Sequence, residues 1–264
     1  MTCTLLHEPT DQLLPGGWKC YGIATVDRPD RSARLRRELV NVGLPFVVTE
    51  GERPTEDAGF DNVATYGCFA SHLASLRLAR DEGVDVAVLV EDDILVARSF
   101  RRALPPMVRQ LDSLDWTMLY MGFLNSSPMR RKPLQRVTEN IARCTGWEVT
   151  GCHFIAVPRT SLDSVIANFE ARLEPGGHRI PADGVYNEYR RDNGFDTFIC
   201  LPNFARQGPS PSGITERPGL KSSLLEHSWI RSLAWPLKRS IWDVLALVPP
   251  SRWERRWNRH ASSS

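Results

Sequence analysis

Apolar residues in this chain follow two alternating patterns. Short unbroken apolar runs, typical of buried strands, alternate with stretches in which apolar residues recur every three or four positions, as on one face of a helix. The predicted strands are residues 21–26, 46–48, 84–90, 117–121, 153–157 and 196–201, and the predicted helices are the segment before Gly43, residues 68–82, 99–111 and 161–173, and the segment after Asp183. This alternation predicts an α/β fold with a mostly parallel central sheet flanked by helices.

Three adjacent acids follow one of the predicted strands. Residues 84–90 are nearly all apolar and β-branched, as in a strand covered on both faces, and they lead directly into Glu91, Asp92 and Asp93. Open α/β sheets bind ligands at the carboxyl ends of their strands. Crowded carboxylates repel one another unless a cation compensates them, and oxygen ligands suit Mg²⁺ or Mn²⁺. The pattern favours a cation that neutralises a departing diphosphate; the alternative is that the acids begin a helix.

The composition narrows the class of protein. The 264 residues are 42% hydrophobic and 24% charged, with a net charge of +2, as in an ordinary globular domain with a tail. The six cysteines form no C-x-x-C pair, which argues against a zinc ribbon and favours buried, reduced thiols. No segment resembles a signal peptide or reaches the ~20 apolar residues of a membrane span, so we expect a cytoplasmic protein.

Seven short segments stand out along the chain. They are residues 26–31 (VDRPDR), 67–72 (GCFASH), 89–93 (LVEDD), 115–122 (DWTMLYMG), 151–154 (GCHF), 181–183 (PAD) and 207–212 (QGPSPS). Together and in this order, they resemble glycosyltransferase family 25, which includes lipopolysaccharide galactosyltransferases and collagen galactosyltransferases. Thr25, Gly213 and a short loop at residues 50–62 depart from the family pattern, and they concern the donor and acceptor more than the type of reaction.

The resemblance implies a single Rossmann-like nucleotide-sugar transferase domain of the GT-A type, which we place at residues 18–222. It implies that Asp93 is the direct ligand of Mn²⁺ or Mg²⁺, and that Asp92 and Glu91 hold the metal or the ribose and sugar of the donor. The implied reaction is an inverting transfer of galactose, or next glucose, from a UDP-sugar to a hydroxyl of a glycan such as lipopolysaccharide. The P-x-D match makes Asp183 the candidate base for the acceptor proton; the alternative is a plain helix N-cap.

Other polar residues of these segments are candidates for donor binding. Arg28 and Arg31 suit the donor phosphates, because arginine binds phosphate bidentately, or else they are solvated charges at a helix start. His72 is either a hydrogen-bond partner of the donor or a buried, satisfied histidine. Gln207 and Ser210 lie in a loop rich in Pro and Ser that is suited to close over the donor.

Residues 223–264 lie beyond the resemblance and form a separate tail. They hold five of the eight tryptophans, interleaved with Arg and Lys. Basic, tryptophan-rich amphipathic segments favour anionic membrane surfaces, which would place the enzyme at the inner face of a membrane. The equal alternative is a C-terminal helix packed on the domain, and nucleic-acid binding is a weaker third possibility.

Two other classes of function stay open. A catalytically silent relative that serves as a binding module has no need to keep three crowded acids. A metal-dependent phosphodiesterase needs further carboxylates or histidines around two metals. His153 is a candidate for a third metal ligand, but a lone histidine carries no ligand spacing.

Overall fold

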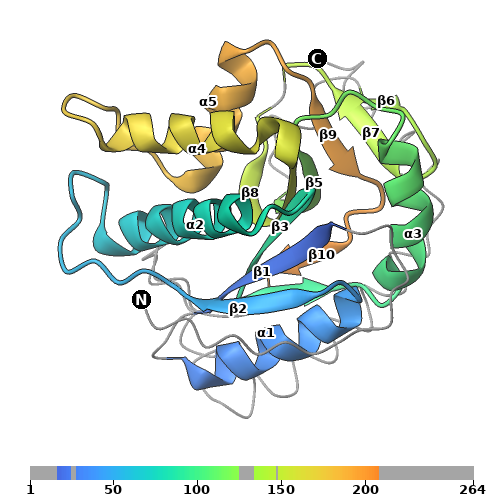
Figure 1. Cartoon of the computed structure of the whole chain (residues 1–264), viewed down its shortest axis with the longest axis horizontal. Coiled ribbons are helices and arrows are strands. Elements are labelled where there is room, and N and C mark those ends of the chain that lie inside the picture. Colours follow the sequence, from blue (N-terminus) through green and yellow to red (C-terminus); the bar gives the residue numbers. More distant parts are fainter. Residues whose placement is uncertain (1–16, 25–27, 125–133, 147, 208–264) are drawn as a thin grey trace, which may run out of the picture.

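The computed structural model describes residues 17–24, 28–124, 134–146 and 148–207, which form strands and helices in alternation (Figure 1). The strands are β1 (Trp18–Ala24), β2 (Phe46–Glu50), β3 (Val86–Glu91), β4 (Ile94–Val96), β5 (Leu119–Leu124), β6 (Gln135–Arg136), β7 (Ile141–Cys144), β8 (Thr150–Pro158), β9 (Thr197–Cys200) and β10 (Ala205–Gln207). The helices are α1 (Pro29–Val42), α2 (Val63–Glu82), α3 (Phe100–Leu111), α4 (Arg159–Leu173) and α5 (Ala182–Asp192).

One sheet holds the described strands together. Its order is β2-β1-β3-β8-β5-β9-β7-β6, and β10 pairs with both β4 and β5. Strands β1, β2 and β3 are mutually parallel, as are β5, β9 and β10, whereas β4, β7 and β8 run antiparallel to their neighbours. The predicted α/β class, with most strands pointing one way, is confirmed. The antiparallel β8 in the middle of the sheet was not predicted, because a buried strand has the same apolar pattern in either direction.

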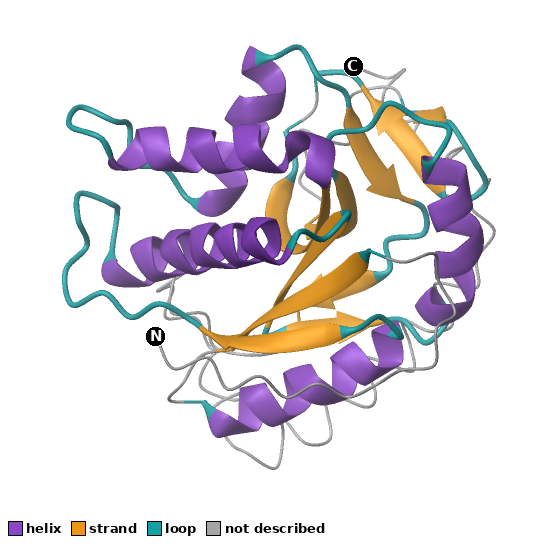
Figure 2. Cartoon of the chain, viewed as in Figure 1, coloured by secondary structure: helices purple, strands orange, loops and turns teal. Residues whose placement is uncertain are grey.

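Helices cover both faces of the sheet (Figure 2). Helices α2, α4 and α5 pack on one face, and α1 and α3 pack on the other. Along β3, Ala87 and Leu89 point into the first core while Val86, Val88 and Val90 point into the second. The unbroken apolar run was therefore correctly assigned to a strand buried on both faces.

Helix α2 begins earlier than the sequence predicts. The pattern predicts a loop up to residue 62 and a helix from Cys68, but the helix starts at Val63. The reason is the N-cap: the Asn62 side chain accepts a hydrogen bond from the Thr65 amide at 2.9 Å, which satisfies one of the free donors of the first turn. The longer helix places residues 67–72 in its interior, where side chains four positions apart lie on one face.

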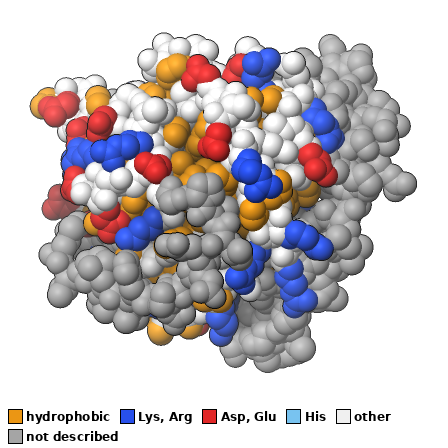
Figure 3. Space-filling view, turned by 45° about the vertical axis from the view of Figure 1, so that its right-hand side comes forward, with side chains coloured by type: hydrophobic (Ala, Val, Ile, Leu, Met, Phe, Trp, Pro, Cys, Tyr) orange, Lys and Arg blue, Asp and Glu red, His pale blue; other side chains and the backbone are white. Residues whose placement is uncertain are grey.

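Several predictions fall outside the described residues. They are the proposed tail at residues 223–264, its association with a membrane, and Ser210. Among the helices that the structure describes, none has the length and apolar character needed to span a membrane. On the face shown in Figure 3, both acidic and basic side chains are present around exposed hydrophobic ones.

Candidate functional site

The carboxyl ends of β1 and β3 lie side by side at the point where the sheet changes direction. From β1 the chain passes through α1 to β2 on one side, and then through α2 to β3 on the other side of β1. Ile23 near the end of β1 is in register with Glu91 at the end of β3. The two crossovers lie on opposite faces of the sheet, and strand ends at such a change of strand order are the usual ligand position in open α/β sheets.

The three acids form a turn at these strand ends. Glu91 is the last residue of β3, and Asp92 and Asp93 connect it to β4; we call residues 91–93 the acidic turn. The alternative that these acids begin a helix is wrong, because the buried strand β4 follows them and pairs with β10. The Val96 amide of β4 also donates to the buried Glu38 carboxylate of α1 at 3.0 Å. The acidic turn is therefore anchored on both sides.

Asp92 is compensated by an arginine from the start of α1. Arg31 Nη1 donates to Asp92 Oδ1 at 3.1 Å, and the two side chains are only 11% and 7% exposed. Such a buried ion pair fixes the turn against α1. Arg28, the other predicted phosphate-binding residue, pairs with Asp30 at 3.2 Å and is more exposed. The structure thus brings Arg31 to the acidic turn, while Arg28 contacts its neighbour on α1.

Asp93 is in a different situation. Its Oδ1 atom is buried and has no hydrogen-bond partner among the described residues. Burial, followed by repulsion from Glu91, raises the pKa of Asp93 to about 7; Arg31 opposes this shift and Asp92 adds to it. A buried carboxylate oxygen without a partner is costly, and a cation is the partner that removes the cost. The donor set therefore fits a hard divalent cation.

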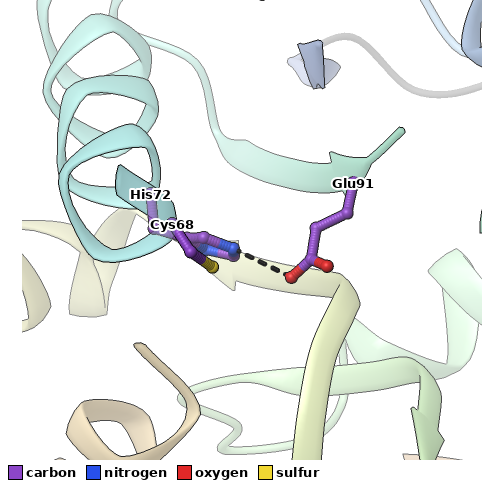
Figure 4. Close-up of side chains that lie close together, drawn as sticks. All are labelled: Cys68, His72 and Glu91. Atoms are coloured by element: carbon purple, nitrogen blue, oxygen red, sulfur yellow. Dashed lines mark hydrogen bonds and ion pairs between the residues drawn. The ribbon is translucent and has the colours of Figure 1, made fainter. Parts of the chain in front are cut away.

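Glu91 turns toward the interior, where it meets α2 and β8. His72 Nε2 lies 3.3 Å from Glu91 Oε1, and Cys152 Sγ lies 3.7 Å from the same oxygen. Burial tends to raise the pKa of Glu91, but the hydrogen bond and charge of His72 outweigh it, with smaller contributions from His153 and Cys152, so the pKa is lowered. Figure 4 shows Glu91 pointing to His72 and Cys68. Glu91 is therefore already partnered within the protein.

Asp183 lies in the first turn of α5. Its Oδ2 accepts from the Gly151 amide at 3.0 Å and its Oδ1 from the Gly184 amide at 2.9 Å. The alternative that Asp183 caps the helix is wrong, because Pro181 occupies the N-cap position. Gly151 has φ +82°, a conformation that favours glycine, and it carries the amide that holds the carboxylate. Two N–H donors thus fix the orientation of Asp183.

Asp183 belongs to the same region as the acidic turn. Burial, and then the charges of Glu91, Asp183 and Asp93 in that order, raise the pKa of the Cys68 thiol well above its usual range. All three carboxylates therefore lie within electrostatic reach of one side chain. Segments that are far apart in the sequence, at 67–72, 91–93, 151–154 and 181–183, meet at one end of the sheet.

His153 and Gln207 lie on the strands next to the acidic turn. His153 is fully buried, and its Nε2–H donates to the Ala205 carbonyl of β10 at 3.3 Å. Burial lowers the pKa of His153, while Glu91 and Ala205 oppose the shift. Gln207 pairs with Ile94, the residue that follows the acidic turn. His153 Nε2 is thus engaged by β10, whereas its buried Nδ1 has no hydrogen-bond partner among the described residues, so the role of His153 as a third metal ligand stays a prediction.

Sequence reasoning missed three residues of this region. Cys68 and Cys152 lie beside His72 and Glu91, and the Tyr186 hydroxyl lies 3.1 Å from His72 Nδ1. A search for C-x-x-C pairs does not detect Cys68. The signal that could have found it is a cysteine and a histidine four residues apart on one helix, Cys68 and His72. No pattern in the sequence links Tyr186 to His72, and only the fold brings the two side chains together.

Comparison with known proteins gives a distant sequence relative. No protein-family model matches the chain. Procollagen galactosyltransferase 2 of Mus musculus is 21% identical over 215 residues, which are 70% of this chain and 33% of that protein. The chain thus spans about a third of the length of this curated relative. The similarity supports a relationship to glycosyltransferases.

Comparison with solved structures gives more remote likenesses. A glycosyltransferase involved in the glycosylation of the major capsid of PBCV-1 is 12% identical with a TM-score of 0.44, over 69% of this chain and 81% of that chain. Mannose-1-phosphate geranyltransferase from Thermus thermophilus is 12% identical with a TM-score of 0.35, over 68% and 58% of the two chains. The inositol-1-phosphate CTP transferase from T. maritima is 13% identical with a TM-score of 0.34, over 82% and 99%. These scores are low, so the likenesses carry no conclusion about activity.

Proposed function

We propose that this protein is a metal-dependent, inverting glycosyltransferase of the GT-A type. It transfers a hexose from a UDP-sugar, UDP-galactose first and UDP-glucose next, to a hydroxyl of a glycan acceptor such as lipopolysaccharide. The observation that carries the proposal is the buried Asp93 Oδ1, which has no partner among the described residues and lies just after the end of β3, where the strand order changes beside β1. The distant similarity to a galactosyltransferase supports the choice of reaction.

Asp93, together with Asp92, would hold Mn²⁺ or Mg²⁺. When bound, such an ion neutralises negative charge that develops on a departing nucleoside diphosphate. Asp92 also pairs with Arg31, so most of the uncompensated charge of the acidic turn resides on Asp93. Because Mg²⁺-type ions are usually held by one or two carboxylates and by substrate phosphates, this donor set leaves room for the diphosphate to complete the coordination.

The start of α1 supports a site for the donor phosphates. Helix α1 has 14 residues and follows β1 in the chain, and its first turn lies beside the acidic turn, because Arg31 pairs with Asp92. The positive end of a helix dipole favours an anion. Arg31 and Arg28 both lie on this end of the helix and add positive charge there. Gln207 and Ser210 remain candidates for a segment that closes over the donor.

Asp183 is the proposed general base. An inverting transfer proceeds by one in-line displacement, and a carboxylate takes the proton of the attacking hydroxyl. The two backbone amides that bind Asp183 hold it in one orientation and leave each oxygen with further acceptor capacity. His72 contacts Glu91 and Tyr186 instead, which supports a role in orienting Glu91 rather than in direct contact with the donor.

The test is nucleotide release from a panel of UDP-sugars with Mn²⁺. We expect slow release of UDP, lost with EDTA and lost in Asp93→Asn, while the exposed control Asp112→Asn keeps it. Turnover that persists in EDTA and in Asp93→Asn refutes the proposal. Cleavage of a simple phosphodiester without any release from UDP-sugars would instead support a metal-dependent phosphodiesterase, and full metal binding without turnover would support a silent binding module.

A further inference from the structure

Four side chains with sulfur, nitrogen and oxygen donors converge beside the acidic turn. Cys68 and His72 come from α2, Cys152 from β8, and Glu91 from the end of β3; we call them the thiol–histidine cluster. The ligand atoms of Cys68, His72 and Glu91 all lie within 4.8 Å of one another (Figure 4). From this arrangement we propose that the cluster binds Zn²⁺ or another thiophilic divalent cation, at a site separate from the one proposed at Asp93.

The spacings within the cluster match a tetrahedral zinc site. Donor atoms that lie ~2.0–2.3 Å from a tetrahedral ion lie about 3.3–3.8 Å from one another. His72 Nε2 lies 3.3 Å from Glu91 Oε1, and Cys152 Sγ lies 3.7 Å from His72 Nε2 and 3.7 Å from Glu91 Oε1. Three edges of the tetrahedron are therefore present. Cys68 is the candidate for the fourth donor, because its sulfur lies within 4.8 Å of the ligand atoms of His72 and Glu91.

The helix explains why Cys68 and His72 point to the same place. Residues four apart lie on one face of an α-helix, so the two side chains leave α2 toward the same side. The other nitrogen of the His72 ring, Nδ1, lies 3.1 Å from the Tyr186 hydroxyl of α5. Metal-binding histidines usually have such a partner on the second nitrogen, because it fixes the orientation of the ring. Tyr186 therefore directs Nε2 into the cluster.

The chemistry of the donors selects the metal. Thiolate and imidazole ligands prefer zinc and other soft or borderline ions, whereas Mg²⁺ and Mn²⁺ prefer oxygen. Burial, and then the charge of Glu91, raise the pKa of Cys152, and the same two causes raise the pKa of Cys68, so both thiols are protonated without metal. Binding would release these protons to the solvent and leave two thiolates, one carboxylate and one neutral imidazole on the ion. Cys68 and Glu91 are partly exposed, which provides a route for entry.

An ion here would tie together three elements that meet beside the acidic turn. Helix α2, strand β3 and strand β8 carry the ligands, and β8 also carries the Gly151 amide that holds Asp183. The inference goes beyond the proposed transfer reaction and does not need it to be correct. Because Glu91 belongs to both the cluster and the acidic turn, an ion in the cluster would hold the Glu91 carboxylate beside His72.

The direct test is a Co²⁺ titration of the full chain, reduced and freed of metal. We expect a sulfur-to-cobalt charge-transfer band in the near ultraviolet, together with tetrahedral d–d bands, which saturate at one equivalent and disappear when Zn²⁺ is added. Cys152→Ala and Cys68→Ala should lose the charge-transfer intensity. Asp93→Asn should keep it, because that carboxylate belongs to the other proposed site. Cys20→Ala, which removes a buried thiol of β1 outside the cluster, is the matched control.

A second measurement does not depend on spectroscopy. Ligands that bind only the folded state raise its stability by mass action, so Zn²⁺ should raise the Tm of the wild-type protein and of Cys20→Ala, but not that of Cys152→Ala. If the four side chains form only a hydrogen-bonded cluster, the wild-type protein shows neither the bands nor the shift in Tm, and the inference fails. It also fails if the bands survive in Cys152→Ala and vanish in Asp93→Asn.

Discussion

Replacement of Asp93 by asparagine should stabilise the metal-free protein near neutral pH while it abolishes transfer. The substitution keeps the shape of the side chain and removes its charge. Burial, and then Glu91, raise the pKa of Asp93 from 3.8 to about 7, and Arg31 offsets this only in part. The folded protein therefore binds a proton more tightly than the unfolded chain does. Stability contributed by this group is highest at low pH and is lost as the pH rises from about 4 to about 7.

The size of the effect on the free energy of unfolding follows from the difference between the pKa of Asp93 in the folded protein and in the unfolded chain. About three pH units correspond to roughly 4 kcal/mol in total, of which about 2–3 kcal/mol develops between pH 5 and pH 8. Other groups also titrate in this range. The lowered pKa of His153 gives the opposite slope below 6.5, and the lowered pKa of Glu91 acts below 4.5. Both residues are present in the variant, so the difference between the two proteins isolates Asp93.

The assay is urea unfolding in EDTA at several pH values, with the midpoint and slope fitted separately. The free energy of unfolding of Asp93→Asn should exceed that of the wild-type protein increasingly from pH 5 to pH 8. Asp112→Asn, at the exposed end of α3, should follow the wild-type curve. Saturating Mn²⁺ should flatten the wild-type curve, because the ion replaces the proton. If the curves for the wild-type protein and Asp93→Asn are parallel across this range, the pKa of Asp93 is not raised in the folded protein. That result would also remove the case for a cation at Asp93.

Three further predictions test neighbouring parts of the site. Asp183→Asn should lower kcat for nucleotide release by a factor of about 10²–10⁴, with little change in the KM of the donor. The control Asp192→Asn, at the other end of α5, should keep the wild-type kcat. An unchanged kcat in Asp183→Asn excludes Asp183 as the base. Glu38→Ala removes the buried carboxylate that accepts a hydrogen bond from the Val96 amide of β4 and should lower the free energy of unfolding by about 1–3 kcal/mol in urea. Glu38→Gln keeps an acceptor oxygen and should lose less; equal losses in both variants would contradict this. By calorimetry, Mn²⁺ should bind weakly alone and more tightly with UDP, with a reciprocal effect on UDP; independent binding of the two would show that they do not share a site.

The sequence predicts the part of the fold that depends on local pattern. The unbroken apolar run before the acidic turn predicts β3, because a strand buried on both faces needs apolar residues at every position. The short strands β4, β6, β7 and β10 were not predicted. They contain two to four residues each, and such segments become strands only because a partner strand lies beside them. The spacing of apolar residues along the chain carries no information about which strand will lie beside a short segment.

The same distinction applies to the site. The position of the acidic turn was predictable. Alternating strands and helices imply an open α/β sheet, and such sheets bind their ligands at the carboxyl ends of strands where the strand order changes. How its charges are compensated was not. His72 and Tyr186 are 114 residues apart in the sequence, and Arg31 and Asp92 are 61 apart. The alternative that Arg28 and Arg31 are solvated helix-start charges describes Arg28 better than Arg31, which is buried against Asp92.

Each of the three acids meets a different environment, and this difference decides which of them is available for chemistry. Asp92 is neutralised by Arg31 from α1, and Glu91 is drawn toward His72 on α2. Asp93 is left with a buried oxygen that has no partner in the described part of the chain. A triplet whose only purpose was structural would gain stability by losing its third charge, since a buried carboxylate without compensation costs free energy. The fold keeps this charge beside two adjacent strand ends at a change of strand order, so a ligand that brings positive charge with it gains most at this position.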